Sequence, residues 1–278
     1  MNYRHAFHAG NFADVLKHAI LLACLKHLAA KPAAFRVIDA HAGVGLYDLT
    51  SPEALRSPEW RDGIGRLWEA GDLPPLLADY RAAVARANPD GALRHYPGSP
   101  ELIAGALRPG DRAILCELHP ADAETVGARY AGAHGVKVEE RDGWGAARAF
   151  LPPPERRGLL VLDPPFEKPD DHAQLLASLA DARDRFETGS VLLWRPIKEA
   201  RAEADYLQRL AATGARVLDA TLRVASPQPR GLVATGVSVV NPPWTLEPAL
   251  REALPLLERL LARDSGSHGC VTRLSGEW

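Results

Sequence analysis

Residues 158–167 read GLLVLDPPFE, and this run indicates an α/β protein more clearly than any other part of the chain. Four or five apolar residues bounded by turn-forming residues are typical of a strand buried in a parallel sheet. Pro164 and Pro165 cannot continue the hydrogen-bonded ladder, so Asp163 is predicted to lie at the carboxyl end of this strand. Ligands of open α/β sheets bind at that edge, which makes Asp163 a candidate catalytic residue.

The residues that follow this strand suit the methylation of an exocyclic amine. The carboxylate of Asp163 and the main-chain carbonyl of Pro164 can accept hydrogen bonds from an amino group. The ring of Phe166 offers a flat face on which a base can stack. The run resembles the Asp/Asn-Pro-Pro-aromatic motif of S-adenosylmethionine-dependent amino methyltransferases.

A second run of the same form, SVVNPPW at residues 238–244, also follows a predicted strand. Only a terminal helix and a short tail are expected after it, which leaves no room for the last three strands of an unpermuted sheet. We therefore assign Asn241 to a turn that ends a strand, and Trp244 to packing or to the rim of the cofactor site.

Strands alternate with helical stretches after about residue 35, which predicts a mostly parallel sheet of seven strands in an α/β fold. The predicted strands are 36–40, 112–117, 136–140, 159–162, 190–194, 216–222 and 233–240. Residues 51–97 contain several short helical patterns and no convincing strand. We expect one domain over residues 1–278, with an inserted helical subdomain at about 51–97.

Composition sets broad limits on the function. The chain has 278 residues, of which 46% are hydrophobic and 24% charged, enough for one large domain. The three cysteines are far apart and predict neither disulfides nor a metal site. No signal sequence or membrane span is expected, which predicts a cytoplasmic protein. With a net charge of -2, a nucleic-acid enzyme would have to gather its Lys and Arg on one face.

A glycine-rich loop follows the first predicted strand in FRVIDAHAGVGLYDL, residues 35–49. Asp39, His41, Gly43 and Gly45 lie just after the strand, where glycines let the main chain approach a ligand. The run resembles the first motif of methyltransferases. The third glycine of the dinucleotide fingerprint is absent, which makes a nicotinamide-dependent dehydrogenase the weakest alternative.

Two further strands are also predicted to end in acids. Glu117 ends the second strand of the sheet, where an acid can hold ribose hydroxyls. Asp142 and Gly143 end the third; in methyltransferases an acid here accepts the adenine amine of the cofactor, although a turn acid is an alternative. Ser99 is expected to return the chain to this site as the N-cap of a helix, with Pro100 at the first helical position.

The N-terminal residues 1–10, MNYRHAFHAG, are rich in aromatic and basic side chains, and we predict that this arm leads into a helix. Asn11 is predicted to cap that helix, with Asp14 in its first turn. The apolar spacing that follows leaves Lys17 and His18 near the mouth of the sheet. The histidines of this segment could also be plain surface residues.

Taken together, the motifs closely resemble the RlmJ family of 23S ribosomal RNA adenine-N6 methyltransferases over essentially the full chain. The motifs that carry this resemblance are YRHAFHAGNFADVLKH, DAHAGVG, YPGSP, ELHP, DGW, RRGLLVLDPPFE and NPPW. The resemblance implies a Rossmann-like S-adenosylmethionine-dependent methyltransferase domain with an inserted helical subdomain. It further implies that the substrate is one adenine of 23S rRNA, and we expect a monomer without metal or membrane partners.

Site residues follow from the resemblance position by position. The implied cofactor-binding residues are His18, His41, Ser99, Glu117, Asp142, Gly143 and Asp163; Asp163, Pro164 and Phe166 are implied in catalysis, and Tyr3, His5 and Lys17 near the target base. The chain departs from the family at Phe166, where Tyr is frequent, and at Phe12, where some relatives are polar. The alternatives are a DNA or protein-amide methyltransferase, and a non-catalytic RNA-binding protein that retains the cofactor pocket.

Overall fold

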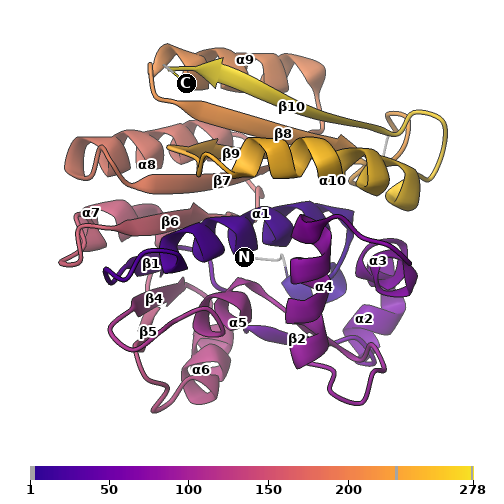
Figure 1. Cartoon of the computed structure of the whole chain (residues 1–278), viewed down its shortest axis with the longest axis horizontal. Helices are drawn as coiled ribbons and strands as arrows, with labels where there is room; N and C mark the ends of the chain where they lie inside the picture. Colours follow the sequence, from indigo (N-terminus) through magenta and orange to yellow (C-terminus); the bar gives the residue numbers. More distant parts are fainter. Residues whose placement is uncertain (1–3, 229–230, 277) are drawn as a thin grey trace.

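The computed structural model describes residues 4–228, 231–276 and 278 (Figure 1). Its centre is an eight-stranded sheet with the strand order β10-β8-β9-β7-β6-β1-β4-β5. The strands of this sheet are β1 (Arg36–Asp39), β4 (Arg112–Glu117), β5 (Val136–Glu140), β6 (Gly158–Leu162), β7 (Ser190–Pro196), β8 (Val217–Arg223), β9 (Ala234–Val240) and β10 (His268–Ser275).

The described residues also form ten α-helices and three short 3-10 helices. The α-helices are α1 (Phe12–Ala29), α2 (Pro52–Arg56), α3 (Ile64–Glu69), α4 (Pro75–Arg86), α5 (Ser99–Ala104), α6 (Pro120–Arg129), α7 (Ala146–Phe150), α8 (Asp171–Arg185), α9 (Ala200–Ala212) and α10 (Leu246–Leu261). The 3-10 helices are η1 (His5–Phe7), η2 (Glu59–Asp62) and η3 (Gly143–Gly145). Among the described helices, none is long and apolar enough to cross a membrane.

Most of the sheet is parallel, and this direction gathers the strand ends at one edge. Strands β5, β4, β1, β6 and β7 pair in parallel, whereas β9 runs antiparallel between β7 and β8. Strand β1 lies in the middle, with Asp39 opposite Leu115 of β4 and Val161 of β6. The carboxyl ends of β1, β4, β5 and β6 therefore lie side by side, as expected for a Rossmann-like methyltransferase fold.

The prediction of seven strands was wrong by one in the main sheet. All seven predicted strands exist, but the tail after α10 adds β10, which pairs antiparallel with β8. Strand β10, HGCVTRLS, has few apolar residues and mostly partly or fully exposed positions because it lies at the sheet edge. An edge strand of this kind lacks the apolar run by which buried strands are recognised.

The segment 51–97 contains four of the helical elements, α2, η2, α3 and α4, but it also contains a strand. β3 (His95–Pro97) pairs antiparallel with β2 (Leu46–Asp48), and this two-stranded ribbon brackets the helices. The expectation that the segment holds no strand was therefore wrong. Three-residue strands are too short to produce a periodic signal in the sequence.

Helices cover both faces of the sheet, and each face has its own apolar core. One core joins β-strand side chains to α1, α3, α4, α5, α6 and α10, and the other joins them to α7, α8 and α9. In Figure 1, α1, α4 and α10 lie in front of the sheet. Helix α1 is buried along its first ten residues, and the expected N-cap is confirmed because Asn11 accepts hydrogen bonds from the N–H groups of Ala13 and Asp14.

Candidate active site

A large cavity opens at the carboxyl ends of the parallel strands. Its volume is about 1180 Å³, more than the 300 to 1,000 Å³ that is usual for one small ligand. Its lining includes His5, Lys17, His18, His41, Gly43, Ser99, Glu117, Asp142, Gly143, Asp163, Pro164, Phe166 and Trp194. The structure thus brings together every predicted site residue that it describes. Tyr3 lies outside the described residues.

Glu117 is fixed in the cavity by two main-chain groups. Its Oε2 accepts a hydrogen bond from Gly43 N at 2.8 Å, and its Oε1 accepts one from His119 N at 2.8 Å. Gly43 has φ +63°, and a side chain there would reach Tyr47 Oη at 2.4 Å, so this turn requires glycine. Each carboxylate oxygen of Glu117 keeps a lone pair, and the two can accept a vicinal pair of hydroxyls.

Gly143 lies where the end of β1 approaches the loop after β5. An added Cβ at this position would meet Ala40 O at 1.8 Å and His41 Nε2 at 2.9 Å. No side chain fits, so the main chain forms part of the cavity wall. The preceding Asp142 accepts a hydrogen bond from Trp144 N through Oδ1 at 3.1 Å and is exposed toward the cavity side.

His41 lines the cavity, and its two buried ring nitrogens have no hydrogen-bond partner within the described residues. Burial lowers its pKa to about 3, so the ring is neutral at physiological pH. Its closest aromatic neighbour is Trp144, which meets it edge to face with ring centroids 5.2 Å apart. Buried polar groups are normally satisfied, so an imidazole that lines a cavity without partners points to a ligand.

His18 and Ser99 form the wall on the side of α1 and α5. Burial lowers the pKa of His18 to about 3, and its Nδ1 lies 2.6 Å from Tyr96 Oη. Asp39, at the end of β1, has its pKa raised to about 7, chiefly by burial. The prediction that Ser99 caps a helix was wrong: Gly98 is the N-cap and Ser99 is the first residue of α5.

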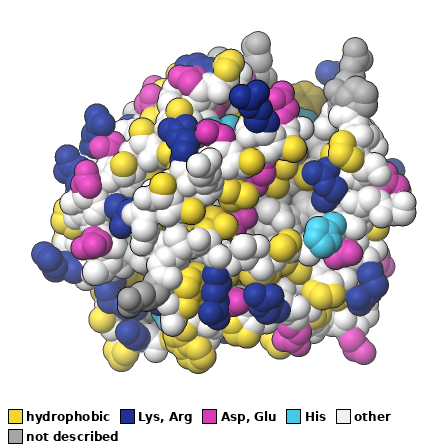
Figure 2. All heavy atoms as spheres, turned by 90° about the horizontal axis from the view of Figure 1, so that it is seen from above, with side chains coloured by type: hydrophobic (Ala, Val, Ile, Leu, Met, Phe, Trp, Pro, Cys, Tyr) yellow, Lys and Arg dark blue, Asp and Glu magenta, His cyan; other side chains and the backbone are white. Residues whose placement is uncertain are grey.

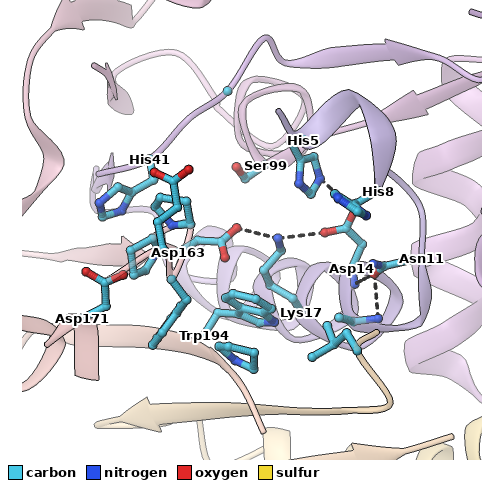
Figure 3. A pocket seen from close by; sticks show the side chains of 18 of the residues that line it. His5, His8, Asn11, Asp14, Lys17, His41, Ser99, Asp163, Asp171 and Trp194 are labelled. Carbon is cyan, nitrogen blue, oxygen red and sulfur yellow. Dashed lines mark hydrogen bonds and ion pairs between the residues drawn. The ribbon is translucent and has the colours of Figure 1, made fainter. Parts of the chain in front are cut away.

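The catalytic corner is a line of three charges (Figure 3). Lys17 Nζ lies 2.5 Å from Asp163 Oδ2 and 2.8 Å from Asp14 Oδ1. The side chains of Lys17, Asp14 and Asp163 are 5%, 3% and 14% exposed. Burial opposes the charge of Lys17, but the two carboxylates outweigh it and hold its pKa well above the ordinary value. The ammonium group is therefore permanently charged and fully engaged.

Lys17 is a cation among the residues implied near the target base, but its surroundings do not suit a contact with the RNA backbone. The ammonium lies between two carboxylates and 5.6 Å from the ring centroid of Trp194, with almost no exposure. A phosphate contact would require breaking buried ion pairs, which is costly. Its position beside Asp163 nevertheless agrees with a place near the target base.

Phe166 holds its ring at the corner through an unusual main-chain conformation. Its φ is +50°, in a region that bulky residues rarely adopt. The ring meets His172 and Trp194 edge to face, with centroids 4.8 and 5.6 Å apart. Strain of this kind persists where the surroundings fix it, and it clusters at functional sites.

The N-terminal arm lies along the mouth of the cavity. His5 Nε2 is 2.9 Å from Asp14 Oδ2, and its ring meets that of Tyr47 edge to face. His8 Nδ1 is 2.9 Å from Glu59 Oε1 of η2, and this hydrogen bond raises the pKa of His8. Both histidines line the cavity. The arm therefore contacts both α1, through Asp14, and the helical segment 51–97, through Glu59.

The second proline motif lies at the opposite edge of the sheet. Asn241 follows β9, which runs antiparallel to β7, and its Nδ2 donates to Glu187 O at 2.7 Å and Gly189 O at 2.9 Å. The assignment of Asn241 to a strand-ending turn is confirmed, although the tail behind it does form another strand. The expectation for Trp244 was wrong, because its side chain is 79% exposed and does not line the cavity.

Two neighbours of the corner were missed as site residues in the sequence. Asp14 was assigned only to the first turn of its helix, and Trp194 only to the end of a strand. Trp194 could have been found by the rule used for Glu117 and Asp163, since it also lies near the carboxyl end of a parallel strand. No local signal identifies Asp14, because its partners are set by the tertiary fold.

The chain is similar to several known proteins. Residues 32–273 match the family described as ribosomal RNA large subunit methyltransferase D, RlmJ. The chain is 41% identical over 281 residues to ribosomal RNA large subunit methyltransferase J of Haemophilus influenzae, covering 100% of both chains. It is 39% identical over 274 residues to the protein of the same name from Escherichia coli, covering 98% of each. A crystal structure of a Legionella pneumophila protein matches with a TM-score of 0.90 and 29% identity, over 96% of this chain and 99% of that one.

Proposed function

Because the chain belongs to the ribosomal RNA large subunit methyltransferase family described as RlmJ, we propose that it methylates the N6 amine of one adenine in 23S rRNA. Membership makes it an S-adenosylmethionine-dependent rRNA methyltransferase with a Rossmann-like fold. The observation that carries the finer proposal is the position of Asp163, Pro164 and Phe166 in the cavity that also contains His41, Glu117 and Gly143.

S-adenosylmethionine fits the half of the cavity at the ends of β1, β4 and β5. Glu117 would hold the ribose hydroxyls, and Asp142 would accept the adenine amine of the cofactor. The flat wall at Gly143 leaves room for a planar ring, since any Cβ there would collide with Ala40 O. His41, with both nitrogens unpaired among the described residues, supplies a further polar contact.

The target base would enter the remaining space beside Asp163. The adenine amine is a poor nucleophile, because its lone pair is delocalised into the ring. By accepting both amino hydrogens, Asp163 and the carbonyl of Pro164 favour a pyramidal nitrogen with a directed lone pair. S-adenosylmethionine supplies a methyl group on a cationic sulfur, which becomes a neutral thioether as the N–C bond forms and the amine releases one proton.

Two features of the corner support an extruded base. Phe166 presents its ring at the cavity, where it can replace part of the stacking that a flipped adenine loses. The carboxylate of Asp163 offsets the positive charge that develops on the amine better than an amide would. His5, at the mouth of the cavity, would cover the base from the other side.

The face in Figure 2 shows Lys and Arg interspersed with Asp and Glu, in agreement with the net charge of -2. On this face we expect local contacts to hold the RNA. We expect the protein to act in the cytoplasm as a monomer on 23S rRNA. Sedimentation of the protein with and without an rRNA fragment measures both the oligomeric state and the stoichiometry.

The decisive experiment measures methyl transfer from labelled S-adenosylmethionine to 23S rRNA that lacks the modification, with the product mapped by nucleoside mass spectrometry. We expect one N6-methyladenine per RNA. Label on DNA but not on RNA would favour the DNA methyltransferase alternative. Cofactor binding without transfer to any polymer would favour the non-catalytic alternative, and label on another RNA atom would refute the N6 assignment.

A further inference from the structure

Asp14 takes part in no step of the proposed reaction, yet it is among the most heavily bonded side chains of the site. Its Oδ2 accepts hydrogen bonds from Gly10 N at 2.9 Å and from His5 Nε2 at 2.9 Å. Its Oδ1 lies 2.8 Å from Lys17 Nζ. The side chain is 3% exposed, and its pKa stays well below the ordinary value because His5 and Lys17 outweigh the effect of burial.

We infer that Asp14 is a positioning residue of the methyl transfer, which shares the ammonium of Lys17 with Asp163 and so leaves Asp163 with an effective negative charge. The inference rests on the proposed role of Asp163. One ammonium nitrogen lies within hydrogen-bonding distance of both carboxylates (Figure 3). The three groups together carry a net charge of one negative unit, at the place where an amine becomes transiently positive.

The charges facing Asp163 make this sharing necessary. With Lys17 alone as its partner, Asp163 would form a neutral pair in a buried site, and its value as a counter-charge for the amine would fall. Without Lys17, Asp14 and Asp163 would be like charges close together with no cation between them, and their repulsion would disturb the position of both carboxylates. Asp39 also acts on Asp163 through space, but its pKa of about 7 makes it only partly charged.

Geometry provides a second reason for Asp14 to act through Lys17. A lysine side chain has many rotamers, and two acceptors on opposite sides of the ammonium fix it in one. Lys17 binds Oδ2 of Asp163, which leaves Oδ1 to accept a hydrogen bond from the amine. His5 on the other oxygen of Asp14 ties the same carboxylate to the N-terminal arm.

The test is a double-mutant cycle with Asp14→Asn, Lys17→Met and the double variant, read as single-turnover methylation at saturating RNA and cofactor. We expect Asp14→Asn to lower the rate about tenfold or more, within the range of coupling between contacting residues. Lys17→Met should also be slow. The double variant, which restores one net negative charge, should be faster than either single variant.

Asp79→Asn is the matched control. Lys26 lies on α1, as Lys17 does, and pairs at 2.5 Å with Asp79 of α4, but the two side chains are 70% and 45% exposed and lie outside the cavity. This variant should keep the wild-type rate. Affinities for rRNA and S-adenosylmethionine, measured by calorimetry and filter binding, should change less than about threefold in Asp14→Asn, so that the loss falls on the rate.

A double variant no faster than the faster of the two single variants would overturn the inference, because a purely structural role predicts cumulative loss. Thermal unfolding checks that each variant folds. If Asp14→Asn alone does not unfold cooperatively while the double variant does, the comparison of the double variant with Lys17→Met decides: a rate above Lys17→Met supports the inference, and an equal or lower rate refutes it. These ratios refer to whichever product the wild type forms. Failure of the N6 assignment therefore shows separately, in the mapped wild-type product.

Discussion

Gly143 offers the sharpest test of the cofactor side of the site, because the structure gives the size of the perturbation. A Cβ added at Gly143 would lie 1.8 Å from Ala40 O, whereas real Cβ atoms essentially never approach within 3.0 Å, so the two segments must separate by about 1.2 Å. The obstacle is main chain at the end of β1, which cannot rotate away as a side chain would. Gly143→Ala therefore forces apart the two strand ends that form the cavity wall.

The resulting strain can lower either the stability of the protein or its affinity for S-adenosylmethionine. Overpacking of this kind costs about 1 to 3 kcal/mol. If the wall keeps its wild-type shape, the unfolding free energy falls by that amount and Tm by about 2 to 12 °C. If the wall relaxes, S-adenosylmethionine must bind against the strain, and its Kd rises by about 5- to 150-fold. In Gly143→Ala we expect the loss of unfolding free energy and the loss of binding free energy for S-adenosylmethionine to sum to at least about 1 kcal/mol.

Thermal unfolding and titration calorimetry on the same preparations measure both quantities. Gly145→Ala is the control, because it lies two residues further on and an added Cβ meets nothing within 4 Å. Its φ of -87° suits alanine, so this variant should match the wild type or be slightly more stable. Wild-type stability together with wild-type affinity in Gly143→Ala would refute the close approach at this wall.

The remaining predictions concern separate parts of the site. Asp163→Ala should lower turnover by about two to four orders of magnitude with little change in cofactor affinity, whereas Asn241→Ala should stay active; the reverse pattern would identify the other proline motif as catalytic. Glu117→Ala should weaken S-adenosylmethionine binding by about 1.5 to 3 kcal/mol in calorimetry, and an unchanged Kd would make Glu117 purely structural. Deletion of Met1–Ala9 should severely reduce RNA methylation while cofactor binding changes little; parallel loss of both would mean that the arm only supports the fold.

The parallel strands could be predicted from the sequence because their burial on both faces requires continuous apolar runs. GLLVL and AILCE are such runs, and the rule that ligands bind at strand carboxyl ends then predicted Glu117 and Asp163 in one cavity. Strand β10 lacked this signal, since one of its edges is unpaired and its side chains are largely exposed. The helix cap at Ser99 was misplaced by one residue, which is the usual uncertainty of element boundaries.

The charge arrangement at the corner could not be predicted, because it depends on distances along the chain that no motif spans. Lys17 and Asp163 are 146 residues apart, and only the packing of α1 beside β6 brings them to 2.5 Å. In a sequence, Lys17 on a helix near the arm of a nucleic-acid enzyme suggests a phosphate contact. Burial reverses that interpretation, since a cation without solvent must pair with the nearest carboxylates.

The packing of the arm gives the helical segment 51–97 a physical connection to the reaction. A Cβ at Gly63 would lie 2.2 Å from Gly10 O, and Ile64 N donates a hydrogen bond to the same oxygen at 2.8 Å. Glu59 of the same segment pairs with His8. The segment therefore fixes the main chain just before α1, and with it the direction in which that helix presents its first two turns. Asp14 and Lys17 belong to those turns, so a change in the packing of the segment would reach the carboxylate at the catalytic corner through one rigid helix.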